Sequence, residues 1–176
     1  MKKKTLDEND FDIFVIGGGV NGAGILRDAA GRGYKCGLAD MGDFGSATSS
    51  SSTKLFHGGL RYLESYQFRL VKESLRERDL LVNLMPHISW PVKFILPHNK
   101  SLRPYWILRL GLYIYDLLAG STNFSKSVGI DLRNNPVGSC LDKSYTRALV
   151  YTDCWVEDSR LVPVSYTHLT LPTKQD

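Results

Sequence analysis

The sequence predicts an α/β fold that opens with a strand–helix–strand (βαβ) unit. Residues 11–16 form a short apolar run rich in β-branched and aromatic side chains, as in a parallel strand that is buried on both faces. A glycine-rich turn at 17–22 ends this run, and residues 23–30 are small and compatible with a helix. Two further glycines end the helix before a second short run, 34–39, which predicts the second strand.

Composition predicts one globular domain or a piece of a larger one. The chain has 176 residues, of which 43% are hydrophobic and 23% charged, enough for one core. Its three cysteines are odd in number and lack a C-x-x-C pair, so neither a disulfide framework nor a zinc site is indicated, and a reducing compartment fits best. The histidines have no partner at metal-ligand spacing, so we expect no metal.

The chain carries no pattern typical of secretion or of a membrane span. Residues 1–10 form a polar leader in which lysines are followed by acidic residues, where a signal peptide needs an apolar stretch. The most apolar segment, 106–118, contains Arg109 and Asp116 and is shorter than the roughly 20 residues that a spanning helix needs. Any contact with a membrane would therefore be peripheral.

Positive charge is concentrated in the middle of the chain. The formal net charge is +4, and residues 54–109 contain ten Lys or Arg against four Asp or Glu. This excess suits a phosphorylated substrate or an anionic membrane surface, and it is equally typical of a solvated helix face.

Beyond the opening unit, the hydrophobic pattern predicts further elements. They are an amphipathic helix over 67–85, a proline-punctuated extended stretch over 86–104, a mostly buried helix over 105–118, loops over 121–145, and a strand over 148–151 that enters 153–158.

The turn after the first predicted strand matches the dinucleotide-binding fingerprint G-x-G-x-x-G in its proper context. Gly17 allows the tight turn, Gly19 lets the backbone approach a pyrophosphate, and Gly22 lets helix and strand pack closely. The pyrophosphate would rest on the helix N-terminus. Asp40, 18 positions after Gly22, ends the second strand and would accept hydrogen bonds from the adenosine ribose. The fingerprint does not distinguish NAD from FAD.

Three separated segments resemble the FAD-dependent glycerol-3-phosphate dehydrogenases of the aerobic type. They are Gly-Gly-Gly-Val-Asn-Gly-Ala-Gly at 17–24 with Arg-Asp-Ala-Ala-Gly-Arg-Gly at 27–33, the run from Ala47 to Leu63 that includes Lys-Leu-Phe-His-Gly-Gly-Leu-Arg-Tyr-Leu, and Tyr-Thr-Asp-Cys-Trp-Val-Glu-Asp at 151–158. The resemblance covers about residues 11–162, and the family's chains are much longer. It implies an incomplete FAD/NAD(P)-binding, Rossmann-like domain with FAD as cofactor.

The resemblance also implies a reaction and its partners. Glycerol 3-phosphate would be oxidised to dihydroxyacetone phosphate, with hydride passing from C2 to flavin N5 and electrons leaving to a quinone. The complete protein would be cytoplasmic and peripheral on the inner face of the cytoplasmic membrane, and nucleic acid is not an expected partner.

The expected cofactor contacts lie in the glycine turn and in the hydroxyl-rich run that follows the second strand. They are Gly17, Gly19, Gly22, Asp40, Thr48, Ser49, Ser50, Ser52 and Lys54. For each serine taken singly, a local turn-forming role is an equal alternative.

Three residues are candidates for the substrate side. Arg61 suits bidentate recognition of a phosphate, and Tyr62 can donate a hydrogen bond to an alkoxide or phosphate. The alternative is a structural ion pair for Arg61 and a core position for Tyr62. His57 would line the flavin or transfer a proton, and its alternative is a structural hydrogen bond.

The end of the chain departs from the pattern of the rest. From Pro163 a run of Val, Ser, Thr, Leu and Pro breaks the expected helix, and residues 163–176 resemble translated sequencing-adapter read-through. We therefore expect this tail to be non-native and the chain to be catalytically inactive by itself. Other interpretations remain open: a glycerol-3-phosphate oxidase, an FAD-dependent amine or amino-acid oxidase-like enzyme, and a non-catalytic dinucleotide-binding remnant.

Overall fold

The computed structural model describes residues 11–170, with side chains up to residue 165. The described chain forms two compact units, the first made of residues 11–54 and 157–170 and the second of residues 55–156. The polar leader expected at 1–10 and the last six residues of the expected tail lie outside the described residues.

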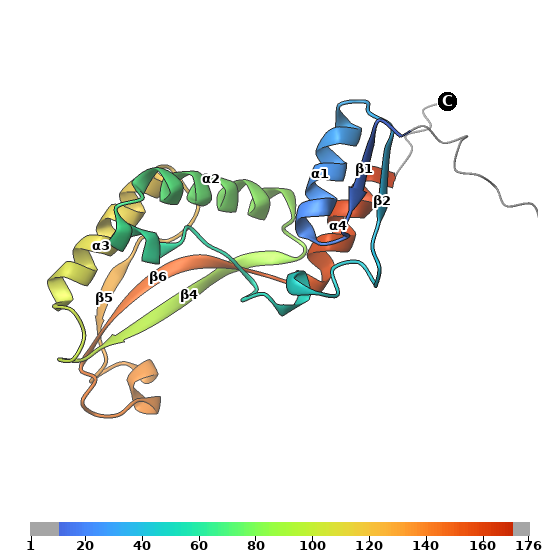
Figure 1. Cartoon of the computed structure of the whole chain (residues 1–176). Coiled ribbons are helices and arrows are strands. Elements are labelled where there is room, and N and C mark those ends of the chain that lie inside the picture. Colours follow the sequence, from blue (N-terminus) through green and yellow to red (C-terminus); the bar gives the residue numbers. More distant parts are fainter. Residues whose placement is uncertain (1–10, 171–176) are drawn as a thin grey trace, which may run out of the picture. The chain divides into compact units, whose positions relative to one another are not determined.

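The first unit is the predicted βαβ unit with two helical additions (Figure 1). Its elements are the strand β1 (Ile13–Ile16), the helix α1 (Val20–Gly31), the strand β2 (Cys36–Ala39), the short 3-10 helix η2 (Thr48–Ser51) and the helix α4 (Asp158–Thr170). The strands β1 and β2 are parallel, with Ile13 opposite Cys36 and Ile16 opposite Ala39. The predicted α/β fold class is therefore confirmed.

The packing of α1 against β1 depends on small residues. A Cβ atom on Gly22 would overlap the carbonyl oxygen of Gly17, so only glycine allows the first turn of α1 to pass this close to the end of β1. Farther along α1, Ala23, Leu26 and Ala29 are buried. The fingerprint glycine thus fixes where the helix begins relative to the strand.

The sequence predicted a strand buried on both faces, but β1 is exposed on part of its surface. Phe14 is 53% exposed and Ile16 is 89% exposed. Within residues 11–170 the sheet of this unit has only two strands, so no further layer covers these side chains. The prediction of a buried strand is therefore wrong for the described chain.

The helix α4 continues past Pro163, so the expected break in helical structure at this position is wrong. Pro163 lies in the helix interior, where proline lacks the N–H that would bond to the fourth residue before it. Ahead of it, Val162 is buried and would lie 3.1 Å from a Cβ on Gly45, which anchors this part of α4 against the loop after β2. Tertiary packing here outweighs the local preference of proline.

The second unit is an antiparallel sheet with helices on one face (Figure 1). Its elements are β3 (Leu55–Phe56), the 3-10 helix η3 (Leu60–Ser65), α2 (Phe68–Leu84), β4 (Ser89–His98), α3 (Tyr105–Ala119), β5 (Val128–Asp131), the 3-10 helix η4 (Pro136–Cys140) and β6 (Arg147–Val156). The long strand β6 is central, since β3, β4 and β5 all pair with it in antiparallel fashion.

The core of the second unit lies between its two long helices and β6. Val71 and Leu75 from α2 pack with Tyr115 from α3, and Tyr151 from β6 packs against this cluster. The rings of Tyr115 and Tyr151 meet edge to face at 6.2 Å between centroids. The helices predicted over 67–85 and 105–118 are confirmed.

Three details of this unit differ from expectation. The helix α3 buries only one face, with Leu112 and Tyr115 inside and Trp106 and Leu117 exposed, so it is not mostly buried. The proline-rich stretch is extended as predicted and forms the strand β4, which pairs only with β6 in the described chain; an edge strand tolerates the missing N–H of proline. The segment 121–145 is not all loop, because β5 lies within it.

No helix among residues 11–170 is both long and apolar enough to cross a membrane.

We expect Gly22→Ala to destabilise the chain by about 3 kcal/mol, because the added methyl group overlaps backbone that cannot move without separating α1 from β1. Urea unfolding followed by circular dichroism measures this. Gly24→Ala is the matched control in the same helix: a Cβ there meets nothing within 4 Å. Alanine is favoured over glycine in a helix by up to about 1 kcal/mol, so the control is expected to unfold at equal or higher urea. Equal destabilisation by both changes would contradict the close-approach argument.

Candidate cofactor and substrate sites

A pocket of about 370 Å³ in the first unit gathers most of the predicted cofactor residues. The glycine turn forms one side and the loop after β2 the other. The predicted residues that line it are Gly17, Gly19, Gly22, Asp40, Thr48 and Ser49. Residues from 17 to 49 therefore converge on one cavity, and their assignment to the cofactor stays a prediction.

The N-terminus of α1 opens into this pocket with only part of its hydrogen-bonding capacity used. Gly19 is the N-cap and supplies no side-chain cap. The amide of Val20 donates to Ser49 Oγ at 3.0 Å, and the other first-turn amides have no acceptor within the helix. A Cβ on Gly19 would lie 3.1 Å from Ser49 Oγ, inside the pocket. The site thus offers backbone donors and a hydroxyl to an anionic group.

Asp40 holds the glycine turn in place. Its carboxylate accepts hydrogen bonds from the amide of Gly18 at 2.5 Å and the amide of Gly42 at 2.8 Å. These bonds, with that from Gly18 the largest cause, lower the pKa of Asp40. The side chain is exposed and ionised at neutral pH, so a carboxylate that orients the turn can also accept from a ribose hydroxyl.

The other three predicted cofactor residues have internal partners. Ser50 Oγ donates to the carbonyl of Gly45, the turn-forming role given above as an alternative. Ser52 Oγ and Lys54 Nζ both contact Asp158 in the first turn of α4, at 3.2 Å and 2.6 Å. None of the three lines the pocket. Their assignment to the cofactor stays a prediction.

The buried carboxylate of Asp158 joins α4 to the segment before β3. Lys54 takes the left-handed backbone conformation, with φ +59°, which is uncommon for a residue with a side chain. The hydrogen bond from Lys54 is the largest cause of the lowered pKa of Asp158. In the sequence, Glu157 and Asp158 are simply adjacent acidic residues, and nothing there indicated that Asp158 would pair with Lys54.

The predicted substrate residues lie on the second unit, on and just before η3. The side chains of Arg61 and Tyr62 make no hydrogen bond or ion pair with any described residue, and Tyr62 is 46% exposed. The alternatives of a structural ion pair and a core position are therefore wrong within the described chain. His57 is exposed, and its Nδ1 accepts from the amide of Gly59 at 2.9 Å. A neutral His57 consequently carries its proton on Nε2.

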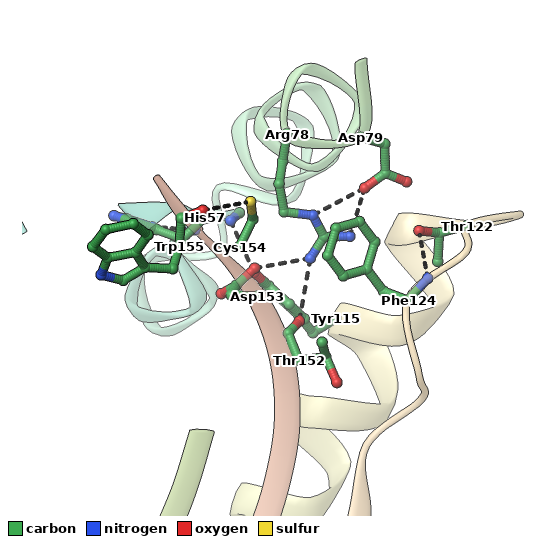
Figure 2. Close-up of polar contacts among 12 residues, drawn as sticks. His57, Arg78, Asp79, Tyr115, Thr122, Phe124, Thr152, Asp153, Cys154 and Trp155 are labelled. Atoms are coloured by element: carbon green, nitrogen blue, oxygen red, sulfur yellow. Dashed lines mark hydrogen bonds and ion pairs between the residues drawn. The ribbon is translucent and has the colours of Figure 1, made fainter. Parts of the chain in front are cut away.

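A buried ionic cluster contacts the loop between β3 and η3 (Figure 2). Arg78 from α2 donates to Asp153 on β6 at 2.8 Å and to Asp79 at 2.7 Å. The hydroxyl of Tyr115 lies 3.0 Å from both oxygens of Asp153 and accepts from the amide of Gly58 at 2.8 Å. The guanidinium carbon of Arg78 stands 4.0 Å from the centre of the Phe124 ring.

Burial sets the protonation chemistry of this cluster. It raises the pKa of Asp153, against the lowering effect of Arg78, and it raises the pKa of Tyr115. Tyr115 is therefore a neutral donor at any physiological pH. Burial likewise raises the pKa of the neighbouring Cys154 thiol to about 11, so this cysteine is not a thiolate nucleophile.

No sequence pattern singled out Arg78, Tyr115 and Asp153 as partners. Asp153 lies in one of the segments that carry the family resemblance, and Arg78 lies in the predicted amphipathic helix over 67–85. A carboxylate in the interior of an apolar strand was the available signal, because such a group needs a buried partner.

The chain belongs to the FAD dependent oxidoreductase family, whose model matches residues 12–167. The match reaches beyond Val162, where the sequence resemblance was expected to end. Membership fits the pocket described above, and the predicted Rossmann-like fold is confirmed.

Within that family, two similar proteins are dehydrogenases named for a polyol phosphate. The chain is 53% identical over 154 residues to D-erythritol 1-phosphate dehydrogenase of Brucella abortus, covering 88% of this chain and 31% of that protein. It is 51% identical over 151 residues to aerobic glycerol-3-phosphate dehydrogenase of Escherichia coli, covering 86% and 30%. The chain thus spans about a third of the length of these relatives, and the resemblance to aerobic glycerol-3-phosphate dehydrogenases is confirmed.

Solved structures agree on the fold. The glycerol-3-phosphate dehydrogenase from Bacillus halodurans complexed with FAD matches 92% of this chain and 25% of its own, with a TM-score of 0.63 and 27% identity. The FAD-bound L-alpha-glycerophosphate oxidase from Mycoplasma pneumoniae matches 90% of this chain and 42% of its own, with a TM-score of 0.65 and 11% identity, which supports the fold alone.

We expect Asp158→Asn to lower the urea midpoint at pH 7, because the carboxylate is buried against Lys54. The pKa of Asp158 is lowered in the folded chain, so its stabilising contribution is present above the unfolded pKa of about 3.9 and is lost as the pH falls through the lower folded pKa. The difference between wild type and variant should therefore shrink under acid. Asp28→Asn is the control, since the Asp28–Arg32 pair is exposed and worth little. If the difference in urea midpoint between wild type and Asp158→Asn does not change with pH, this explanation is wrong.

Proposed function

We propose that this chain is the FAD-binding part of a dehydrogenase that oxidises a polyol phosphate, with glycerol 3-phosphate as the substrate and dihydroxyacetone phosphate as the product. The observation that carries the proposal is about 50% identity, over most of the chain, to two dehydrogenases whose names specify a polyol phosphate. The match to the first of these covers 88% of this chain.

The pocket of the first unit suits the pyrophosphate and ribose of FAD. Gly19 leaves open the space that a side chain would fill, and the first-turn amides of α1 supply donors to phosphate oxygens. Ser49 adds a hydroxyl at the same edge, and Asp40 adds a ribose acceptor. Flavin, when bound, supplies the hydride acceptor, and the side chains of this protein position and polarise the substrate.

The loop of the second unit suits a phosphorylated alcohol. Arg61 has five N–H donors with no described partner, and a guanidinium binds phosphate oxygens in pairs. Tyr62 adds an exposed hydroxyl beside it. His57, held by Gly59 as the Nε2–H form, can donate a hydrogen bond to the substrate oxygen, whereas acting as a base would require its tautomer to change.

One of the similar proteins supports a second candidate substrate, D-erythritol 1-phosphate. The identity to the D-erythritol 1-phosphate dehydrogenase, 53%, is as high as that to the glycerol-3-phosphate enzyme, 51%. Both substrates join an alcohol to a phosphate, so the described guanidinium and hydroxyl serve either one. We propose glycerol 3-phosphate first, and D-erythritol 1-phosphate is the competing substrate in the test.

The electron acceptor and location are also part of the proposal. Dehydrogenases of this aerobic type suggest a quinone as acceptor and peripheral contact with an anionic membrane surface from the cytoplasmic side. The oxidase, the amino-acid oxidase-like enzyme and the non-catalytic remnant are the other outcomes of the assay.

The test is a purified enzyme from a complete gene that carries this sequence, assayed with each polyol phosphate and a quinone analogue under air and under nitrogen. We expect anaerobic quinone reduction with glycerol 3-phosphate and stoichiometric dihydroxyacetone phosphate. Peroxide release without quinone reduction would identify an oxidase. Flavin binding without turnover of either phosphate, or no flavin binding, would overturn the proposed activity.

We expect Gly19→Val to abolish flavin binding, because the branched side chain enters the pocket beside Ser49. The flavin absorbance of the purified complete enzyme measures this. Gly24→Val is the matched control, at a position of the same helix where a Cβ has open space. Full flavin content in the Gly19 variant would show that the cofactor does not use this turn.

We expect Arg61→Ala to raise the KM for glycerol 3-phosphate about 100-fold, as for loss of a charge-assisted hydrogen-bonded pair, with normal flavin content. Steady-state kinetics measure this. Arg69→Ala, which removes an exposed arginine from α2 in the same unit, is the control and should leave KM unchanged. Loss of flavin with unchanged KM would instead assign Arg61 to the cofactor.

A further inference from the structure

The loop that carries the proposed substrate residues is fixed by one buried contact. Between β3 and η3, the amide of Gly58 donates to the Tyr115 hydroxyl at 2.8 Å, from a helix 57 residues farther along the chain. Gly58 and Gly59 are buried, whereas His57, Arg61 and Tyr62 on either side are exposed. The position of these three side chains therefore depends on where Tyr115 holds the backbone between them.

The direction of the Tyr115 hydroxyl is set by Asp153. Both oxygens of Asp153 lie 3.0 Å from it, and Asp153, paired with the Arg78 guanidinium at 2.8 Å, is the acceptor of this hydrogen bond. Tyr115 must then donate its single proton to Asp153, which leaves an oxygen lone pair for Gly58. The bonds run in one direction, from Gly58 through Tyr115 to Asp153.

Arg78 fixes Asp153 in turn. The two side chains are each about 2–3% exposed and meet at 2.8 Å. Arg78 also donates to the carbonyl of Thr152 at 3.3 Å and contacts Asp79 at 2.7 Å, with Phe124 stacked over it. Side chains from α2, α3 and β6 thus form one connected set of hydrogen bonds that reaches the loop at Gly58 through Tyr115. No buried side-chain nitrogen or oxygen of the described chain lacks a partner.

The backbone at the end of this chain of bonds has little room to move. A Cβ on Gly58 would lie 2.5 Å from Leu75 and 2.7 Å from the Tyr115 hydroxyl. Adjacent glycines can let the backbone approach a ligand closely. At Gly58, the space is taken by the protein's own core. Gly59 follows in the left-handed conformation, with φ +66°, and its amide holds His57.

We propose that Tyr115, Asp153 and Arg78 are positioning residues for substrate binding, an inference that rests on the proposed function. Their buried hydrogen-bond chain holds the loop at Gly58 and thereby sets the placement of His57, Arg61 and Tyr62. None of the three touches the substrate. They act through the backbone of the loop.

Stabilisation of the folded chain does not by itself explain why a buried ionic cluster is found here. A buried ion pair loses much of its Coulombic gain to desolvation, and well-packed apolar side chains of similar volume often serve equally well or better. What apolar side chains cannot supply is an oriented acceptor for a backbone amide. The cluster provides this acceptor at Gly58, the first of the two residues between His57 and η3.

The test is Tyr115→Phe in the complete flavin-loaded enzyme, with Tyr113→Phe as the matched control. Tyr113 lies on the same helix and is 59% exposed, so its hydroxyl should be dispensable. Two quantities are measured: amide hydrogen exchange of a peptide covering 55–65, and kcat and KM for glycerol 3-phosphate. We expect roughly tenfold faster exchange in that peptide only, as for loss of a buried hydrogen bond, and a roughly tenfold higher KM with kcat and flavin content nearly unchanged.

Two results would overturn the proposal. One is unchanged exchange at 55–65 together with unchanged KM. The other is faster exchange throughout the second unit with loss of flavin, which would assign Tyr115 to general stability.

If Tyr115→Phe does not fold, Asp153→Asn decides, because Arg78 keeps Asp79 as a counter-ion in that variant. It removes the charge that orients the Tyr115 hydroxyl, and it should show the same local change in exchange and in KM. Normal exchange and KM in Asp153→Asn would overturn the proposal.

The exchange measurement does not depend on the substrate assignment. If Arg61→Ala leaves KM unchanged, the proposed substrate role fails while local exchange at 55–65 still reports on the loop. If Arg61→Ala raises KM but Tyr115→Phe changes neither quantity, the proposed function stands and the positioning role fails.

Discussion

The close approach of α1 to β1 at Gly22 is the constraint on which the first unit depends. Because no side chain separates Gly22 from the carbonyl of Gly17, the helix starts directly at the end of the strand, and its first-turn amides open into the pocket. Asp40 then ties the glycine turn to the end of β2 through Gly18. One packing requirement thus creates both the helix position and the anion-binding geometry.

The second unit solves a different problem, which is to hold an irregular loop in a defined conformation. A loop has no ladder of backbone hydrogen bonds, so its amides need acceptors from elsewhere. Tyr115 provides one at Gly58, and the His57 ring provides another at Gly59. The polar cluster around Asp153 is fully partnered within the described chain, which is the condition under which a buried polar network defines one conformation.

The comparisons with known proteins and the geometry support the same class of chemistry on separate grounds. Family membership rests on a match over residues 12–167. The pocket rests on the glycine turn, the free helix amides and Ser49. The proposed substrate side rests on an exposed arginine and tyrosine without described partners. In the proposed function, the choice between glycerol 3-phosphate and D-erythritol 1-phosphate depends on contacts to the carbon chain, because a guanidinium bound to the phosphate would not distinguish the two substrates.

Features that are encoded by short stretches of residues could be predicted from the sequence. The G-x-G-x-x-G turn at 17–22, the βαβ unit, the helices α2 and α3, and the assignment of Gly19 and Asp40 to one site follow from short-range patterns, since each needs particular residue types at fixed spacing. The expectation that Ser49 lies beside them came from the family resemblance. The tertiary structure decided what depends on partners distant in sequence. It placed β5 in a segment that looked like a loop, carried α4 through Pro163, paired Lys54 with Asp158, and joined Gly58, Tyr115, Asp153 and Arg78. Arg78 and Asp153 are 75 positions apart, and periodicity carries no information about which buried charges will meet at such a distance.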